Sequence, residues 1–134
     1  MNRMLMIGGS MVVAVGLMAG AYAWGGRDAG ASTLLDGPAF AAQYAATPGA
    51  VLVDVRTPAE YAGGAMPGAL LADYTDPSFA SAVAKLDPSK PHFIYCRSGN
   101  RSSHAAEIMR EAGIAQIYEL RGGLASWPHL AAQH

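Results

Sequence analysis

A nearly unbroken apolar run from Ala50 to Val55 is the feature that most limits the folds open to this chain. Apolar residues that follow one another without alternation are typical of a parallel strand covered on both faces. A second run, Phe93 to Tyr95, has the β-branched and aromatic content of a buried strand. Segments with helical spacing separate such runs, so the sequence predicts a layered α/β fold with a parallel sheet and right-handed crossovers.

Capping residues predict where the helices begin and end. Asp36 with Pro38, and Thr57 with Pro58, are typical helix starts, and Gly113 is a typical left-handed helix end. We expect strands at 33–35, 50–55, 69–71, 93–95 and 114–120. We expect helices from 36 and from 57, over 79–86, and from near 102 to 113, the last with one apolar face made of Ala105, Ile108, Met109 and Ala112.

The only cysteine, Cys96, directly follows the second apolar run and begins a polar loop that leads into a helix. Ser98, Gly99 and Asn100 tolerate tight or left-handed backbone geometry, so N–H groups of the loop can converge on the sulfur. Converging amides, the positive end of the following helix and the two arginines of the loop favour the ionised thiol. The sequence therefore predicts a nucleophilic thiolate. The alternative is a small buried hydrophobe, which the flanking arginines and the glycine disfavour.

The residues from Cys96 to Ser102, Cys-Arg-Ser-Gly-Asn-Arg-Ser, resemble the active loop of the rhodanese (thiosulfate sulfurtransferase) family in its single-domain form. The resemblance extends to four further segments in the family's order and approximate spacing, namely 53–61 (VDVRTPAEY), 64–69 (GAMPGA), 120–123 (LRGG) and Trp127. Together they extend over nearly everything after Ser32. The resemblance implies a rhodanese-like three-layer α/β/α domain with a central, mostly parallel sheet.

The activity implied by the resemblance is sulfur transfer. Sulfane sulfur would move from a donor such as thiosulfate to a thiol or cyanide acceptor through a persulfide on Cys96, which would be the catalytic residue. This chemistry needs no general base and no cofactor. The residues expected to bind the anionic donor and the persulfide are Arg97, Ser98, Gly99, Asn100, Arg101 and Ser102.

Three charged residues lie at and after the end of the first apolar run. We interpret Asp54, Arg56 and Glu60 as an ion-pair and hydrogen-bond group that supports the loop beneath the site. None of them is a proton donor that thiol chemistry needs, so a direct catalytic role is the weaker interpretation. The family usually has a histidine at the position of Ala65, and its absence removes a polar contact there.

Two other functions stay open. A cysteine phosphatase or arsenate reductase also holds a thiolate in an amide cradle, but its loop is one residue longer than the four residues that separate Cys96 from Arg101 here. The tighter ring favours sulfur over an oxyanion of phosphate size. The alternative from another class is an exported persulfide carrier or binding module with little turnover, which delivers sulfur to a protein acceptor.

The first residues of the chain differ in composition from the rest. No charged residue occurs from Met4 to Gly26, and such a run can cross a bilayer as a helix at about 1.5 Å per residue. We expect a signal peptide, with small-residue cleavage sites within 19–23, or an uncleaved membrane anchor, with Tyr22 and Trp24 at the interface. With Arg3 on the retained side, either role predicts an exported domain that is periplasmic or membrane-anchored outside the cytoplasm.

The expected domain organisation is a leader at 1–26, a linker at 27–32, one rhodanese-like domain at 33–130 and a C-terminal tail at 131–134. Of the nine basic residues only Arg3 lies in the leader, so eight face ten acidic residues, and nucleic acid is not an expected partner. A single cysteine forms no internal disulfide. The four histidines lack ligand spacing, so the sequence indicates no metal site.

Overall fold

The computed structural model describes residues 31–131, and the predicted leader at 1–26 and most of the predicted linker and tail lie outside them. Strands and helices alternate along the described chain. In order they are β1 (Thr33–Leu35), α2 (Gly37–Ala46), β2 (Val51–Asp54), α3 (Pro58–Ala62), β3 (Leu70–Leu71), α4 (Phe79–Ala84), β4 (His92–Tyr95), α5 (Asn100–Glu111), β5 (Ile117–Leu120), α6 (Gly123–Ser126) and the 3₁₀ helix η3 (Pro128–Leu130).

The strands form one parallel sheet of five, in the order β1-β5-β4-β2-β3. At its centre, Ile94 of β4 is in register with Val53 of β2 on one side and with Glu119 of β5 on the other. Because all strands run the same way, the carboxyl ends of β2, β4 and β5 meet at one edge of the sheet, where open α/β sheets place their chemistry. The loop that begins at Cys96 starts from this edge.

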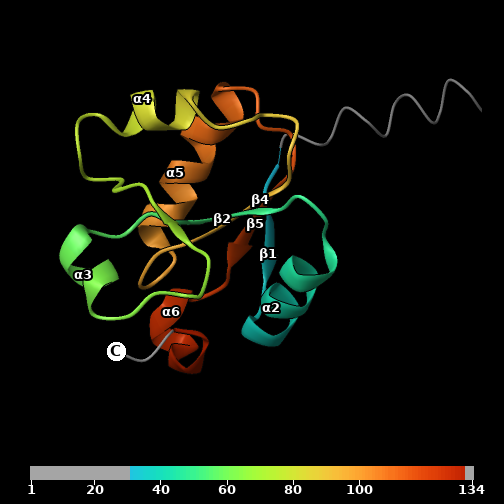
Figure 1. Cartoon of the computed structure of the whole chain (residues 1–134), viewed down its shortest axis with the longest axis vertical. Helices are drawn as coiled ribbons and strands as arrows, with labels where there is room; N and C mark the ends of the chain where they lie inside the picture. The colour runs from blue at the N-terminus through green and yellow to red at the C-terminus, as the bar shows by residue number, and fades with distance from the viewer. Residues whose placement is uncertain (1–30, 132–134) are drawn as a thin grey trace, which may run out of the picture. The chain divides into compact units, whose positions relative to one another are not determined.

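Helices cover both faces of the sheet, which gives the predicted three layers, and Figure 1 shows α4 and α5 on one side with α2 and α6 on the other. Alternate residues of each strand point to opposite faces. The core on the α4–α5 side contains Val53, Ile94 and Cys96. The core on the α2–α6 side contains Leu52 and Phe93. The cysteine side chain therefore belongs to the same layer as α5.

The predicted starts of α2 and α3 are confirmed in position, but only that of α3 is confirmed in its capping mechanism. At α3 the Thr57 hydroxyl accepts from the Glu60 N–H and the Glu60 carboxylate accepts from the Thr57 N–H, which is a complete capping box. At α2 the Asp36 side chain makes no capping hydrogen bond and instead pairs with Arg121, 3.2 Å away. The sequence pattern therefore predicted the start of α2 correctly. The Asp36 carboxylate pairs with Arg121, which follows β5, instead of capping the helix.

The helix after the cysteine loop differs from the prediction in two respects. It begins at Asn100 rather than near 102, because Gly99 takes the left-handed N-cap conformation with φ 100°. Its apolar face also differs, since Ala112 is exposed and Ala106 is buried in its place. The earlier start puts Ser102 inside the first turn, where backbone N–H groups have no carbonyl partner within the helix and can donate to other groups.

Among residues 31–131, no helix is both long and apolar enough to cross a bilayer. Within the same range, no three His, Cys, Asp or Glu side chains gather as candidate metal ligands. The leader, its cleavage and the location of the domain stay predictions from the sequence.

A buried histidine lies at the opposite end of β4 from the cysteine. The imidazole of His92 is fully buried, its Nδ1 is 2.8 Å from the Lys90 carbonyl oxygen, and its Nε2 has no hydrogen-bond partner. The short Nδ1 contact to a carbonyl assigns the proton of the neutral ring to Nδ1. Burial lowers the pKa of His92 below its ordinary 6.5, more than the Lys90 carbonyl raises it.

We expect the free energy of unfolding to decrease as the pH falls below about 6.5, by at most about 1.4 kcal/mol per pH unit, because the unfolded chain then binds a proton that folded His92 rejects. Above pH 6.5 this contribution is constant. Urea unfolding of His92→Asn at several pH values should lack this slope, and His104→Asn, which changes an exposed ring, should retain it. An unchanged slope in the His92 variant would contradict the assignment.

Candidate active site

Cys96 lies directly after β4, at the carboxyl edge of the sheet. Its side chain is fully buried, at 0 % exposure, between the end of β4 and the first turn of α5. The buried position follows from the strand alternation, because Cys96 continues the face of Ile94 toward the helix layer. The sulfur therefore lies within the protein, and the exposed residues of the loop are its neighbours Arg97, Ser98 and Asn100.

Two backbone N–H groups donate to the sulfur. The Gly99 N–H donates to Cys96 Sγ at 3.0 Å and the Ser102 N–H donates at 3.4 Å. Both depend on the left-handed geometry of Gly99, which turns the chain sharply from loop to helix. The helix N-terminus adds its partial positive charge at the same point. Peptide hydrogens and a helix dipole directed at a sulfur are the arrangement that stabilises an anion there.

A buried serine and a buried glutamate extend this network. The Cys96 thiol lies 3.6 Å from Ser102 Oγ, and the Ser102 hydroxyl lies 3.3 Å from Glu119 Oε1 and 3.2 Å from the Gly99 carbonyl oxygen. Sequence reasoning missed Glu119, which is 4 % exposed on β5. A signal was present, because an acidic residue inside the apolar segment 114–120 is unusual for a buried strand.

Arg101 is bound by a carboxylate rather than left open to a ligand. Its guanidinium forms a forked pair with Glu60 of α3, with N···O distances of 2.8 and 3.0 Å. The Arg101 hydrogen bond, assisted by Thr57, lowers the pKa of Glu60 to about 2 against the opposing effect of burial. The pair ties α3 to the first turn of α5 beside the loop.

The other two supporting residues form a separate, buried pair. Arg56 Nη2 lies 2.7 Å from Asp54 Oδ2 and also donates to the Gly64 carbonyl oxygen at 2.7 Å. Although burial lowers the pKa of Arg56, the hydrogen bond and charge of Asp54 raise it above its ordinary value. The pair thereby connects the end of β2 to the turn before Ala65, which is itself buried.

The backbone of the cysteine loop is held from the other side by α6. The Leu124 N–H donates to the Cys96 carbonyl oxygen at 2.9 Å and the Ala125 N–H donates to the Arg97 carbonyl oxygen at 2.8 Å. This approach requires a glycine at 123, because a Cβ there would lie 2.3 Å from the Arg97 carbonyl oxygen. Gly123 also has a left-handed φ of 68°.

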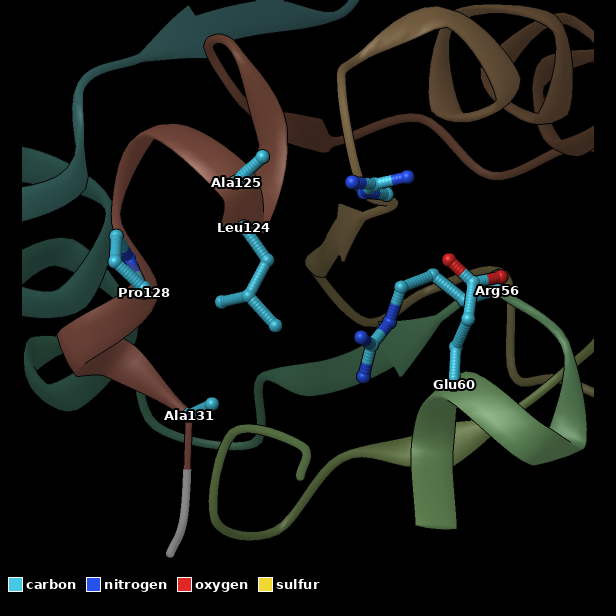
Figure 2. Close-up of a pocket in the computed structure, with 7 residues that line it drawn as sticks. Arg56, Glu60, Leu124, Ala125, Pro128 and Ala131 are labelled. Carbon is cyan, nitrogen blue, oxygen red and sulfur yellow. The ribbon is translucent and has the colours of Figure 1, made fainter. Parts of the chain in front are cut away.

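A cavity of about 310 Å³ opens beside the loop. One wall carries the charged side chains of Arg56, Glu60 and Arg97. The other is made of residues from α6, from η3 and from the position after η3, namely Leu124, Ala125, Pro128 and Ala131. Figure 2 shows the guanidinium of Arg56 pointing into the space opposite Leu124 and Ala131. The cavity thus has a polar side suited to an anion and an apolar side suited to carbon chains.

The structure brings most of the predicted site residues to one edge but gives them different surroundings. Gly99 and Ser102 contact the sulfur through their N–H groups. Arg97 lines the cavity. It belongs to none of the ion pairs found among residues 31–131, which are Asp54–Arg56, Glu60–Arg101 and Asp36–Arg121. Ser98 and Asn100 are exposed.

Comparison with known proteins gives one family. The family model described as "Rhodanese-like domain" matches residues 38–129. A sulfurtransferase of Allochromatium vinosum is 37% identical over 94 residues, which are 69% of this chain and 85% of that protein. A thiosulfate sulfurtransferase of Pseudomonas entomophila is 35% identical over 79 residues, which are 59% of this chain and 71% of that protein.

A solved structure supports the fold alone. The crystal structure of a rhodanese-related protein from Thermoplasma volcanium superimposes with a TM-score of 0.65 over 76% of this chain and 99% of that one. The two sequences are 20% identical, so the likeness concerns the arrangement of strands and helices.

We expect Gly123→Ala to disturb the site more than the fold, because a methyl group at 123 displaces the Arg97 carbonyl and with it the loop. Gly49→Ala is the matched control, since Gly49 has a similar φ of 76° and no atom within 4 Å of the added Cβ. Both should lose about 1–2 kcal/mol of unfolding free energy from the positive φ, and Gly123→Ala should lose more because its Cβ also meets backbone atoms of the loop. Only Gly123→Ala should change the rate at which iodoacetamide alkylates Cys96, and equal alkylation rates in both variants would contradict the α6 contact.

Proposed function

Because this chain belongs to the rhodanese-like domain family, we propose that it is a sulfurtransferase that moves sulfane sulfur through a persulfide on Cys96. The family match and the sulfurtransferases among its relatives support sulfur transfer in general. The observation that carries the specific proposal is the pair of N–H groups, from Gly99 and Ser102, that donate to the sulfur. They would stabilise an anion on this atom in the thiolate and in the persulfide.

The proposed reaction has two steps. In the first, the Cys96 thiolate attacks the outer sulfur of thiosulfate, a new S–S bond forms, the old S–S bond breaks, and sulfite leaves with the electron pair. The cysteine then carries a persulfide anion. In the second, cyanide or a thiolate attacks the outer sulfur, takes it away as thiocyanate or a new persulfide, and restores the Cys96 thiolate. In each step one bond to the transferred sulfur forms as one S–S bond breaks, and the electron pair of the broken bond leaves with sulfite or with Cys96, so no external oxidant or reductant is needed.

Donor capture is assigned to Arg97 rather than shared equally between the two arginines of the loop. Arg97 is exposed and lines the cavity, whereas the guanidinium of Arg101 is occupied by Glu60. Arg101 would hold α3 against α5 through its ion pair with Glu60. Because the sulfur is fully buried, a donor reaches it only when the side chains over it move.

A persulfide carrier for a protein acceptor is the second candidate, and the specific observation in its favour is the apolar side of the cavity. Leu124, Pro128 and Ala131 offer little to thiosulfate or cyanide, which are small and polar. They suit the carbon part of a larger thiol acceptor. A carrier would form the Cys96 persulfide in stoichiometric amount and turn over free cyanide slowly.

We expect Cys96→Ser to abolish thiocyanate formation from thiosulfate and cyanide while the thermal unfolding curve stays near that of the parent protein. Mass spectrometry of the parent after thiosulfate should show one added sulfur, and the serine variant should show none. Activity that survives in Cys96→Ser would refute the proposed mechanism. Faster turnover of a phosphate ester or arsenate than of thiosulfate would replace it with the phosphatase or reductase alternative.

We expect Arg97→Ala to raise KM for thiosulfate by about tenfold or more, because a charge-assisted contact to an anion contributes roughly 1.5–3 kcal/mol. Arg110→Ala, an arginine in the last turn of α5, is the matched control and should leave KM unchanged. KM is measured by steady-state kinetics at one ionic strength, so that screening of charges by salt is the same for both variants. If Arg97→Ala retained the parent KM, donor capture would have to be assigned to another group.

A further inference from the structure

Glu119 is a buried carboxylate that the proposed reaction leaves without a role. It is 4 % exposed on β5, and its Oε2 accepts a hydrogen bond from Ser32 Oγ at 2.5 Å. Its Oε1 faces Ser102 Oγ at 3.3 Å. Among residues 31–131 it forms no ion pair with a basic side chain. Its position two hydrogen bonds from the Cys96 sulfur calls for an explanation.

The three side chains form a continuous line of hydrogen-bonding groups. Cys96 Sγ lies 3.6 Å from Ser102 Oγ, which lies 3.3 Å from Glu119 Oε1. The serine has one hydroxyl hydrogen and two lone pairs, so it can accept from one neighbour while donating to the other. With a neutral thiol, the S–H donates to Ser102, and Ser102 donates to the Glu119 carboxylate. With a thiolate, the order reverses, because protonated Glu119 donates to Ser102 and Ser102 donates to the sulfur.

We propose that Cys96, Ser102 and Glu119 share one proton, which passes from the thiol through the Ser102 hydroxyl to Glu119 as the sulfur becomes an anion. The S–H bond breaks and its electron pair stays on sulfur. Ser102 Oγ gains that proton and releases its own to Oε1 of Glu119. Both end states are fully hydrogen-bonded and carry the same total charge, so neither leaves an unpaired buried group. Glu119 acts through Ser102 and is therefore a positioning residue.

Burial of the sulfur limits the groups that can take its proton. At 0 % exposure the thiol has no contact with solvent into which to release its proton, and Ser102 is the one side chain within 31–131 to which the thiol is found to donate. The Gly99 carbonyl competes for the same hydroxyl hydrogen at 3.2 Å. When the Ser102 hydroxyl donates to the Gly99 carbonyl, its oxygen can still accept from the Cys96 thiol. The hydrogen bond from Ser102 to Glu119 is then absent. Ionised Glu119 holds the hydroxyl in the line because a charged acceptor binds it more strongly.

Other charged groups around the sulfur are already neutralised or lie at the surface. Arg101 of α5 is close enough to Cys96 to interact with it electrostatically, but it is paired with Glu60 of α3. Arg56 at the end of β2 is paired with Asp54. Arg97 is exposed, and so is His104 of α5, whose ring stacks on Tyr74 at 6.2 Å. None of them is a hydrogen-bond partner of the thiol among the contacts of residues 31–131.

The experiment compares alkylation of Cys96 by iodoacetamide in the full-length parent protein and in Glu119→Gln, from about pH 5.5 to about pH 9. The alkylation rate measures the fraction of Cys96 that is a thiolate. Restricted access of the reagent to the buried sulfur lowers the rate by the same factor at every pH, so the ratio of rates at two pH values within one protein does not depend on access. Because the shared proton keeps part of the sulfur ionised in acid, the parent rate should level off there. Glu119→Gln should lose this level and react about tenfold more slowly at the acid end, with equal rates at the alkaline end.

The opposite result overturns the proposal. If Glu119 acts only as a nearby negative charge, its removal eases ionisation of the thiol, and Glu119→Gln alkylates as fast as the parent or faster in acid. Glu107→Gln, which changes an exposed carboxylate on α5, is the matched control and should follow the parent. Glu119→Asp retains a carboxylate and should restore part of the acid-side rate.

Ser102→Ala tests the link between the two ends. It should lower the acid-side rate as Glu119→Gln does, and the double variant should show no further loss. An added loss in the double variant, or an unchanged rate in Ser102→Ala, would overturn the relay, and Ser102→Ala decides the matter even if Glu119→Gln fails to fold.

The inference rests on the proposed function for its use in sulfur transfer. Because alkylation needs no sulfur donor, failure of thiosulfate turnover and failure of the relay are seen separately.

Discussion

The N–H groups of Gly99 and Ser102 donate to the Cys96 sulfur only while the loop backbone stays in one conformation. Two elements hold it from opposite sides. On one side, α5 begins at the left-handed Gly99 and carries Ser102 in its first turn. On the other, α6 donates its Leu124 and Ala125 N–H groups to carbonyl oxygens of the loop. The peptide groups are fixed before any ligand arrives, so the site needs little reorganisation to stabilise an anion.

Charge around the loop is arranged in pairs, and the pairing decides which groups remain for a ligand. Asp54 neutralises Arg56 at the end of β2, and Glu60 neutralises Arg101 between α3 and α5. These pairs join segments far apart in the sequence and set the walls of the cavity. Among residues 31–131, Arg97 is an exposed cation that lines the cavity and belongs to none of these pairs. Under the proposed function, a small anion would therefore be attracted to Arg97 rather than to several guanidinium groups.

Much of the fold was predictable because its signals are local. The apolar run 50–55 gave β2, Thr57 with Glu60 gave the capping box of α3, and the cysteine after Phe93 to Tyr95 lies at a strand-to-helix turn as expected. The start of α5 was misplaced because Gly99 can end a loop or cap a helix, and the local sequence does not show that it takes the left-handed N-cap conformation. Ala112 was assigned to the buried face because spacing alone does not show where the sheet ends.

The sequence by itself singled out Cys96 as the candidate nucleophile and indicated the kind of layered fold that presents it, because a lone cysteine in a Gly- and Arg-containing turn is encoded within a few positions. The tertiary structure alone decided which partners the side chains choose. Arg101 pairs with a carboxylate 41 positions away, and Ser102 faces Glu119, 17 positions away. Such contacts are selected when parallel strands align their carboxyl ends, a relation between distant segments that no local pattern records.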